Sequence, residues 1–304
     1  MIAALGAPWS ELDWQGPLPA MAGLSWVGCD NELFASSSPD VVPVLAKVPR
    51  SHTAVIGNRA SRVAALVAAG EAGLGPAVLA ADPESGVVVQ AASARQMGTL
   101  LRIGRPGALE SYLTARSAFR SLPVNLAPRD VFEDVAALAA ELDRIGVRRP
   151  SEGAPVYAQL DRMQAAVADG PAPAPSWGSG EISNTLIGTD GSVELVGGEL
   201  AGLSDPLSDV GMVLAELAPF VADDDEVMAL AWGESNAGAL GRARLYGIAD
   251  DIRASYLSLL AHTHDPDSPA EFVGYLGSRL RRAVFAVASP AYEGWIADAT
   301  KGWR

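Results

Sequence analysis

The chain has 304 residues, of which 49% are hydrophobic and 19% are charged, a composition typical of a folded globular protein and not of a disordered one. Its formal net charge of −14 argues against a nucleic-acid partner, because polyphosphate backbones are themselves anionic. Cys29 is the only cysteine, which excludes an intramolecular disulfide and a thiolate metal cluster. No apolar stretch is long enough to span a bilayer and the N-terminus does not resemble a signal peptide, so we expect a soluble cytoplasmic protein without membrane contact.

The first ninety residues predict short strands with one helix among them. Residues 24–34, 41–48 and 87–90 are rich in β-branched side chains and are bounded by Gly, Ser, Asp and Pro. Residues 59–72 have helical composition and end at Gly73, a residue typical of helix termini.

From residue 92 onward the pattern is mainly helical, with one hairpin. A Pro-rich connector at 170–175 precedes a hairpin of 185–188 and 193–196 around the turn residues Asp190 and Gly191. The expected helices cover residues 94–103, 109–122, 131–145, 156–168, 210–222, 226–231, 240–261 and 270–287. The sequence thus predicts an α+β fold with two lobes, a sheet-rich N-lobe over 1–91 and a helical C-lobe over 92–304, with a cleft between them.

Five blocks resemble the choline/ethanolamine kinase branch of the aminoglycoside-phosphotransferase-like kinases. They are L-A-K-V-P (45–49), N-R-A-S-R-V-A (58–64), A-G-L-G-P-A-V-L-A-A-D-P-E-S-G-V-V-V (72–89), S-N-T-L-I (183–187) and L-A-G-L-S-D-P-L-S-D-V-G (200–211). The resemblance implies a protein-kinase-like bilobal fold that holds ATP and Mg²⁺ in the interlobe cleft. It also implies that the C-lobe binds the acceptor alcohol.

The resemblance assigns nucleotide contacts to the N-lobe. Lys47 matches the strand residue that grips the phosphates, and Gly23, Gly28, Gln90 and Ala92 match the phosphate-covering turn and the hinge.

Two neighbouring features disagree with a nucleotide site. Arg62 stands where a Glu partner of Lys47 is usual, and it either repels Lys47 or faces solvent in a shifted register. Trp26 replaces a small polar residue, and its bulk is large enough to fill the phosphate space, where Asp30 and Glu32 add negative charge.

The positions where the resemblance places the catalytic and metal-binding acids depart further from the family pattern. Ser179 stands where the resemblance places the catalytic Asp, and a hydroxyl cannot accept a proton as a carboxylate does. Gly197 replaces the main Mg²⁺-binding Asp, which leaves only Asn184 and Glu199 as metal ligands. Glu181 is either a substitute acid or an exposed loop residue.

Other positions that the resemblance assigns serve structure or the acceptor. Asp209 matches a residue that braces the catalytic loop, and Asp205 matches a structural position that also suits a helix N-cap. Tyr256 and Trp295 are the aromatic residues left for an acceptor pocket in 210–304, although the sequence does not support choline specificity. The H-T-H-D-P-D segment, 262–267, is either a metal site or ordinary surface.

We therefore expect a pseudokinase that acts by binding a small ligand in the cleft or a protein partner. The alternative is a divergent ATP-dependent phosphotransferase that acts on a small amino-alcohol or hydroxylated substrate. A third interpretation is a purely structural protein whose cleft is filled.

Overall fold

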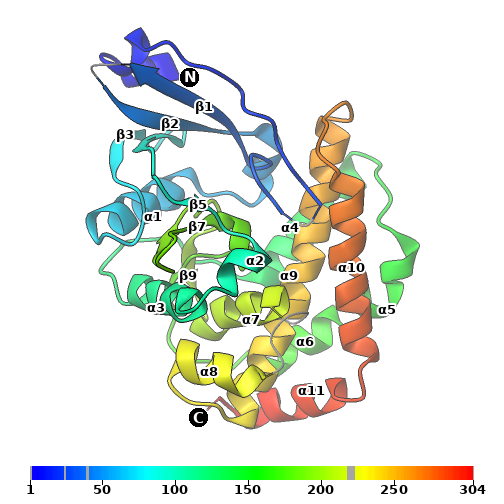
Figure 1. The fold of residues 1–304 in the computed structure, drawn as a ribbon. Coiled ribbons are helices and arrows are strands. Elements are labelled where there is room, and N and C mark those ends of the chain that lie inside the picture. Colours follow the sequence, from blue (N-terminus) through cyan, green and yellow to red (C-terminus); the bar gives the residue numbers. More distant parts are fainter. Residues whose placement is uncertain (1, 24, 39–40, 218–222, 304) are drawn as a thin grey trace.

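The computed structural model describes residues 2–23, 25–38, 41–217 and 223–303, which form two lobes (Figure 1). The N-terminal lobe contains a four-stranded antiparallel sheet in the order β1-β2-β4-β3, made of β1 (Asn31–Ser38), β2 (Val41–Pro49), β3 (Val78–Asp82) and β4 (Val87–Ala91). Val44, Ala46 and Val89 on this sheet pack against the N-terminal segment, which carries η1 (Ile2–Leu5) and η2 (Trp9–Glu11).

Helix α1 (Arg59–Glu71) lies beside the sheet and forms as its sequence predicts. The Asn58 side chain accepts a hydrogen bond from the Ser61 amide and so satisfies one of the free donors at the helix start. Val63, Leu66 and Ala69 share the buried face of this helix.

Short strands connect the two lobes. β5 (Gln96–Met97) pairs with β7 (Thr185–Ile187), and β7 pairs with β8 (Val193–Leu195) in the predicted hairpin. β6 (Ala174–Ser176) pairs with β9 (Gly202–Ser204). This pairing fixes both ends of the segment between the two strands, which contains the predicted catalytic loop. The remaining 3₁₀ turns are η3 (Ser51–Val55), η4 (Ser151–Gly153) and η5 (Ile182–Asn184).

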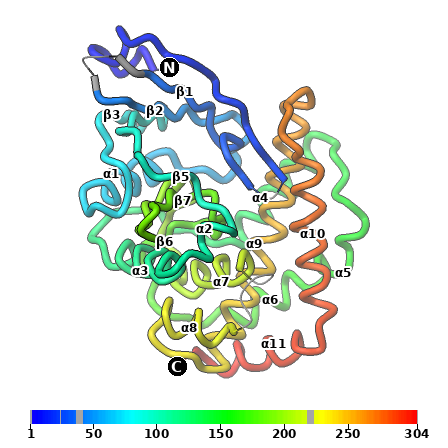
Figure 2. The backbone as a smooth tube through the Cα atoms, in the orientation of Figure 1, coloured from blue at the N-terminus to red at the C-terminus, as the bar shows by residue number. Residues whose placement is uncertain are grey.

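The C-terminal lobe is helical and is organised around one long helix, as the tube view shows (Figure 2). α9 (Ala237–His264) is buried along most of its length because α4, α7, α10 and α11 all pack against it. The helices of this lobe are α2 (Leu100–Ile103), α3 (Ala108–Arg120), α4 (Val131–Arg144), α5 (Ala154–Tyr157), α6 (Leu160–Ala166), α7 (Pro206–Leu217), α8 (Asp224–Trp232), α9, α10 (Phe272–Ala288) and α11 (Tyr292–Lys301).

Several sequence predictions are wrong in detail. The strand predicted over 24–34 begins only at Asn31, because the backbones of Met21 and Val27 bond to each other and close a turn before it. The helix predicted over 94–103 is helical only from Leu100, where the Thr99 side chain caps it. The helix predicted over 156–168 is divided into α5 and α6.

Other differences concern element ends and elements that the sequence did not reveal. α7 starts at Pro206 and not at residue 210, since Pro suits the first turn of a helix. The predicted end of this helix at 222 lies outside the described residues. Strand β3 and helix α11 were not predicted. No helix within the described ranges combines the length and apolarity needed to cross a membrane.

Candidate functional site

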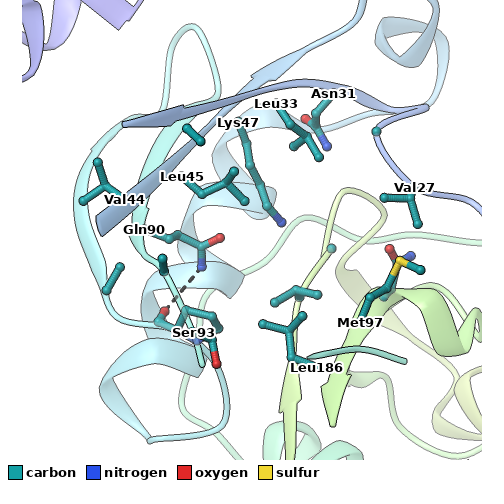
Figure 3. Close-up of a pocket in the computed structure, with 18 of the residues that line it drawn as sticks. Val27, Asn31, Leu33, Val44, Leu45, Lys47, Gln90, Ser93, Met97 and Leu186 are labelled. Atoms are coloured by element: carbon teal, nitrogen blue, oxygen red, sulfur yellow. Dashed lines mark hydrogen bonds between the residues drawn. The ribbon is translucent and has the colours of Figure 1, made fainter. Parts of the chain in front are cut away.

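A cavity of about 390 Å³ lies in the cleft between the lobes (Figure 3). Its walls are mainly aliphatic and come from β1, β2 and β7 and from the segment after β4; they include Leu33, Val44, Leu45, Met97 and Leu186. Gly28, Gln90, Ala92, Asn184, Gly197, Glu199 and Lys47 also line it, so most of the residues singled out in the sequence converge on one cavity.

Lys47 on β2 points toward the cavity and has a fixed partner (Figure 3). Its Nζ lies 4.0 Å from Oε1 of Glu199, and both side chains are buried. Burial lowers the pKa of the Lys47 ammonium, and Glu199 opposes this shift. Glu199 thus gives Lys47 an acidic partner, which the residue at position 62 does not provide.

Glu199 also contacts Arg62 on α1, so it connects three segments. Arg62 Nε lies 3.8 Å from Glu199 Oε1, and Asn31 Nδ2 donates to the same oxygen at 2.7 Å. Burial opposes ionisation of Glu199, but Lys47 and Arg62 hold its pKa below the usual value. The alternative that Arg62 faces solvent is wrong, because Arg62 is buried. Its charge does oppose that of Lys47 and lowers the Lys47 pKa, and the Glu199 carboxylate contacts both cations.

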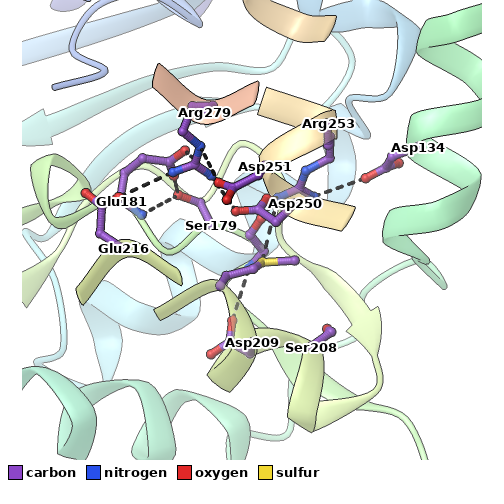
Figure 4. Close-up of polar contacts among 12 residues, drawn as sticks. Asp134, Ser179, Glu181, Ser208, Asp209, Glu216, Asp250, Asp251, Arg253 and Arg279 are labelled. Carbon is purple, nitrogen blue, oxygen red and sulfur yellow. Dashed lines mark hydrogen bonds and ion pairs between the residues drawn. The ribbon is translucent and has the colours of Figure 1, made fainter. Parts of the chain in front are cut away.

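The catalytic-loop positions bond to one another (Figure 4). The Ser179 hydroxyl donates to Oε2 of Glu181 and accepts a 3.0 Å hydrogen bond from Asn184 Nδ2. The Tyr275 hydroxyl donates to the other Glu181 oxygen at 3.1 Å. Glu181 is therefore not an exposed loop acid, since 89% of its side-chain surface is covered, the exposed part being 11%.

Gly197 has a backbone conformation that a side chain does not tolerate. Its φ of +102° is in the left-handed region, and a Cβ built there would lie 2.8 Å from Cγ of Asn184. An Asp at this position is therefore excluded both by backbone strain and by contact with the neighbouring amide.

The donor set at the catalytic end does not fit Mg²⁺. This ion prefers octahedral oxygen ligands with carboxylates among them. Glu199 is held by two cations, and Asn184 is engaged with Ser179. Among the residues that the structure describes, no cluster of three or more His, Cys, Asp or Glu side chains is arranged to hold a metal.

Asp209 on α7 accepts hydrogen bonds from the segment that precedes Ser179. Its Oδ1 receives the Ser176 hydroxyl at 2.8 Å and the Trp177 amide at 3.1 Å. Arg116 forms a two-point ion pair with the same carboxylate, at 2.6 and 3.1 Å. Although burial opposes ionisation, Arg116 keeps the pKa of Asp209 below its usual value.

Asp205 precedes α7 and caps its first turn. Oδ1 accepts the Leu207 amide at 2.8 Å, and Oδ2 pairs with Arg242 and accepts the Tyr246 hydroxyl at 3.2 Å. Burial raises the pKa of Asp205 despite these partners.

Trp26 lines both the large cavity and a much smaller pocket of about 20 Å³ beside Ser179. Its ring centroid lies 4.7 Å from that of Tyr275 and 5.7 Å from that of Phe272. Its amide donates to Ser183 Oγ at 3.1 Å, and its indole Nε1 donates to Asp30 Oδ2 at 2.9 Å.

Asp30 is the buried acid that accepts the Trp26 indole hydrogen bond. Burial and the nearby Glu199 charge raise the pKa of Asp30 to about 7. Both acids line the large cavity, and the charges of both act on Lys47 and Arg62.

The hinge and the turn differ from what the resemblance implies for a nucleotide. The Ala91 amide donates to Ala77 O at 2.9 Å and the Ala92 amide donates to Pro43 O at 2.8 Å, so both donors are used within the protein. Gln90 Nε2 donates to Pro76 O at 3.3 Å. Gly23 does not line the large cavity but borders a second hollow beside Glu181.

The two aromatic residues expected in the acceptor pocket lie elsewhere. The Tyr256 ring packs 5.5 Å from that of Tyr157, and Trp295 lies under the Arg244 guanidinium at 5.6 Å. Neither residue lines the large cavity or the small pocket.

Sequence reasoning missed a charged network behind Ser179 (Figure 4). Asp250 is buried between Arg253, at 2.5 Å, and Arg279, at 2.6 Å. Arg253 also donates to Gly178 O at 2.6 Å and so fixes the backbone of the catalytic loop. Two acids and an arginine in D-D-I-R (250–253), within a helix rich in apolar residues, were the available signal.

The fold is similar to that of known small-molecule kinases. A choline/ethanolamine kinase family protein from Mesorhizobium loti aligns with a TM-score of 0.76 and 24% identity, over 99% of this chain and 98% of that chain. Choline kinase LicA from Streptococcus pneumoniae aligns with a TM-score of 0.68 and 16% identity, over 92% and 95%. A thermostable mutant of aminoglycoside phosphotransferase APH(4)-Ia aligns with a TM-score of 0.62 and 15% identity, over 92% and 96%.

No protein-family model matches the sequence, and comparison with curated proteins gives no match either. The structural likeness at these identities concerns the fold. The predicted protein-kinase-like bilobal fold, of the kind found in choline/ethanolamine kinases and aminoglycoside phosphotransferases, is confirmed.

Proposed function

We propose that this protein is a catalytically inactive, choline/ethanolamine kinase-like protein that acts by binding a small ligand in the interlobe cavity. The observation that carries the proposal is the position of Asn184, whose Cγ would lie 2.8 Å from a Cβ at residue 197. It leaves no room for a carboxylate at the position where the resemblance places the principal metal ligand. Without that ligand, the dication that neutralises developing charge in phosphoryl transfer lacks its main support.

The state of the other chemical groups supports the same proposal. The Ser179 hydroxyl donates a hydrogen bond to Glu181, and a hydroxyl cannot take a proton from a substrate as a carboxylate does. The pocket beside Ser179 is small, about 20 Å³, and Trp26 lines both it and the large cavity. The cavity itself remains open, which argues against a purely structural protein with a filled cleft.

A solved complex of LicA with AMP belongs to the same set of similar structures, so nucleotide binding is the property to test here. Thermal melting of the wild type with ATP and Mg²⁺, with ATP and EDTA, and without nucleotide is expected to show no Mg²⁺-dependent stabilisation. ATP turnover in the presence of choline or ethanolamine is expected to equal that of the Lys47→Met variant.

A Mg²⁺-dependent rise in melting temperature, together with turnover that Lys47→Met abolishes, would contradict the proposal. That result would establish the divergent phosphotransferase, with Glu181 and Glu199 as its acids.

A further inference from the structure

We infer that the contact between the 3₁₀ turn η3 and the helices α4 and α9 is an acid-sensitive latch between the two lobes. Protonation of His52, which lies within this contact, releases η3 from the C-terminal lobe while each lobe stays folded. The side chains that form the contact are different from those that line the interlobe cavity, so the inference does not depend on the proposed function.

η3 can join the lobes because it belongs to one of them and packs on the other. It follows strand β2 of the N-terminal lobe, and it contacts α4 and α9 of the C-terminal lobe. Val55 and Ile56 pack against a hydrophobic core that α4 and α9 help to form. Arg50 Nη1 lies 3.6 Å from Oδ2 of Asp265, an ion pair that joins the start of η3 to the C-terminal end of α9.

His52 is buried in this contact and has one unsatisfied ring nitrogen. Its side chain is 4% exposed, and its Nε2 has no hydrogen-bond partner. The ring centroid lies 6.4 Å from that of His264 in the last turn of α9, and both rings line a hollow of about 450 Å³. Because both nitrogens of a protonated imidazole are donors, the charged ring would need an acceptor at Nε2 that the closed contact does not supply.

Two acids of the C-terminal lobe lie at this contact, and both are already paired. Glu141 on α4 lines the hollow and accepts two hydrogen bonds from Arg144, each at 2.6 Å. Asp265 is paired with Arg50. Among the described residues that line the hollow, no carboxylate is therefore free to balance a charge on His52, and a buried charge without a partner is costly.

The same surroundings determine the direction of the pH dependence. Burial, Arg50 and His264 lower the pKa of His52 to about 4, and a hydrogen bond with the Cys29 backbone opposes this shift. A hydrated imidazole has a pKa of about 6.5. The open contact therefore binds the proton more readily than the closed one, so acid favours opening progressively from about pH 6.5 down to about pH 4.

Hydrogen exchange followed by mass spectrometry tests the inference on the full chain. After correction for the pH dependence of intrinsic exchange, the opening constant of residues 51–57 is expected to rise on the order of 50-fold between about pH 7 and about pH 4.5. Peptides from α3, which is not part of the contact, are expected to keep their protection over this range.

Three variants assign the effect to one side chain. His52→Phe keeps a ring that cannot take a proton, and it is expected to remove most of the acid-induced opening. His52→Lys places a permanent charge in the contact and is expected to open residues 51–57 at pH values near 7. His262→Phe is the matched control, because His262 is on the same helix as His264 but does not line the hollow.

Melting curves at neutral pH show whether each variant is folded, and His52→Gln replaces His52→Phe if the latter is not. Unchanged protection of residues 51–57 in acid would overturn the inference, as would an equal loss in His52→Phe or its substitute. A simultaneous loss in α3 would also overturn it, because the chain would then unfold as a whole. Acid-induced opening that His262→Phe retains and His52→Phe lacks would support it.

Discussion

The two ends of the interlobe cleft differ in what they retain. The hinge end is an open cavity whose aliphatic walls come from both lobes. The catalytic end is closed, and its polar groups already have partners within the protein: Lys47 with Glu199, and Ser179 with Glu181. The comparison teaches that one end of a cleft can stay open while, at the other end, side chains of the protein pair with one another.

Buried side chains of the C-terminal lobe hold the backbone of the catalytic loop in place. Asp209 still accepts the Trp177 amide, and Arg253 still donates to the Gly178 carbonyl. These bonds hold the loop from two sides. The backbone of the loop is thus held in place independently of the side chains at its catalytic positions.

The largest expected effect breaks this support. Asp209→Ala leaves the buried Arg116 guanidinium without its carboxylate, and we expect the free energy of unfolding to fall by about 4 kcal/mol. Urea denaturation measures the loss. Asp298→Ala, which removes an exposed pair with Lys301, is the control and should change stability little. A loss for Asp209→Ala as small as that of the control would show that the loop does not depend on Asp209.

Substitution of Trp26, which lines both pockets of the cleft, has the next largest effect. Trp26→Ala removes a buried ring that packs on Tyr275 and Phe272, so we expect a loss of about 3 kcal/mol in urea denaturation. Trp26→Phe keeps a ring and loses the indole bond to Asp30, and should cost about 1 kcal/mol. Equal costs would place the stabilisation in the hydrogen bond instead of the packing.

A pH experiment sharpens the comparison at Asp30. The pKa of about 7 means that the folded state holds a proton that the unfolded state has released, so wild-type stability falls as pH rises toward 7. Asp30→Asn keeps an oxygen for Trp26 and does not titrate. We expect the unfolding free energy of the variant relative to the wild type to rise by about 2 kcal/mol between about pH 5.5 and pH 8.

Several charged groups influence the ionisation of Asp30 or of the neighbouring Glu199; they are Glu181, Lys47, Arg62 and Glu199 itself. Asp30→Asn leaves all of these groups unchanged. Glu32→Gln, outside the cavity, is the control and should follow the wild type across the same pH range. A pH-independent difference between Asp30→Asn and the wild type would mean that Asp30 is ionised throughout.

The smallest expected effect concerns activity. Ser179→Asp restores one acid, but the new carboxylate lies beside Glu181 and no second metal ligand appears at residue 197. We therefore expect no ATP turnover above wild type in an assay with Mg²⁺ and choline or ethanolamine. Turnover in this single variant would show that the catalytic end is less closed than its contacts indicate.

Much of the fold could be predicted because local patterns agreed with the tertiary structure. Helix α4 repeats apolar residues at intervals of three and four, and the β7–β8 hairpin surrounds an Asp-Gly turn. Strand β3, V-L-A-A-D, was missed because its alanines carry little strand preference, and pairing with β4 determines its structure.

The sequence predicted which residues line the candidate site, but not which of them pair with one another. The blocks around Lys47, Asn184 and Glu199 indicated that these residues converge, and they line one cavity. The Asn31–Glu199 bond joins residues 168 positions apart, and no local pattern reveals which acid pairs with which cation. For the same reason the packing of Trp26 on Tyr275 emerged only from the fold.

The backbone at Gly197 has a consequence for the history of the chain. Because Asn184 occupies the space beside its Cα and the φ angle suits glycine alone, regaining an acid there requires the loop to be rebuilt before the codon change is useful. A single Gly197→Asp change would therefore introduce backbone strain before it could supply a metal ligand.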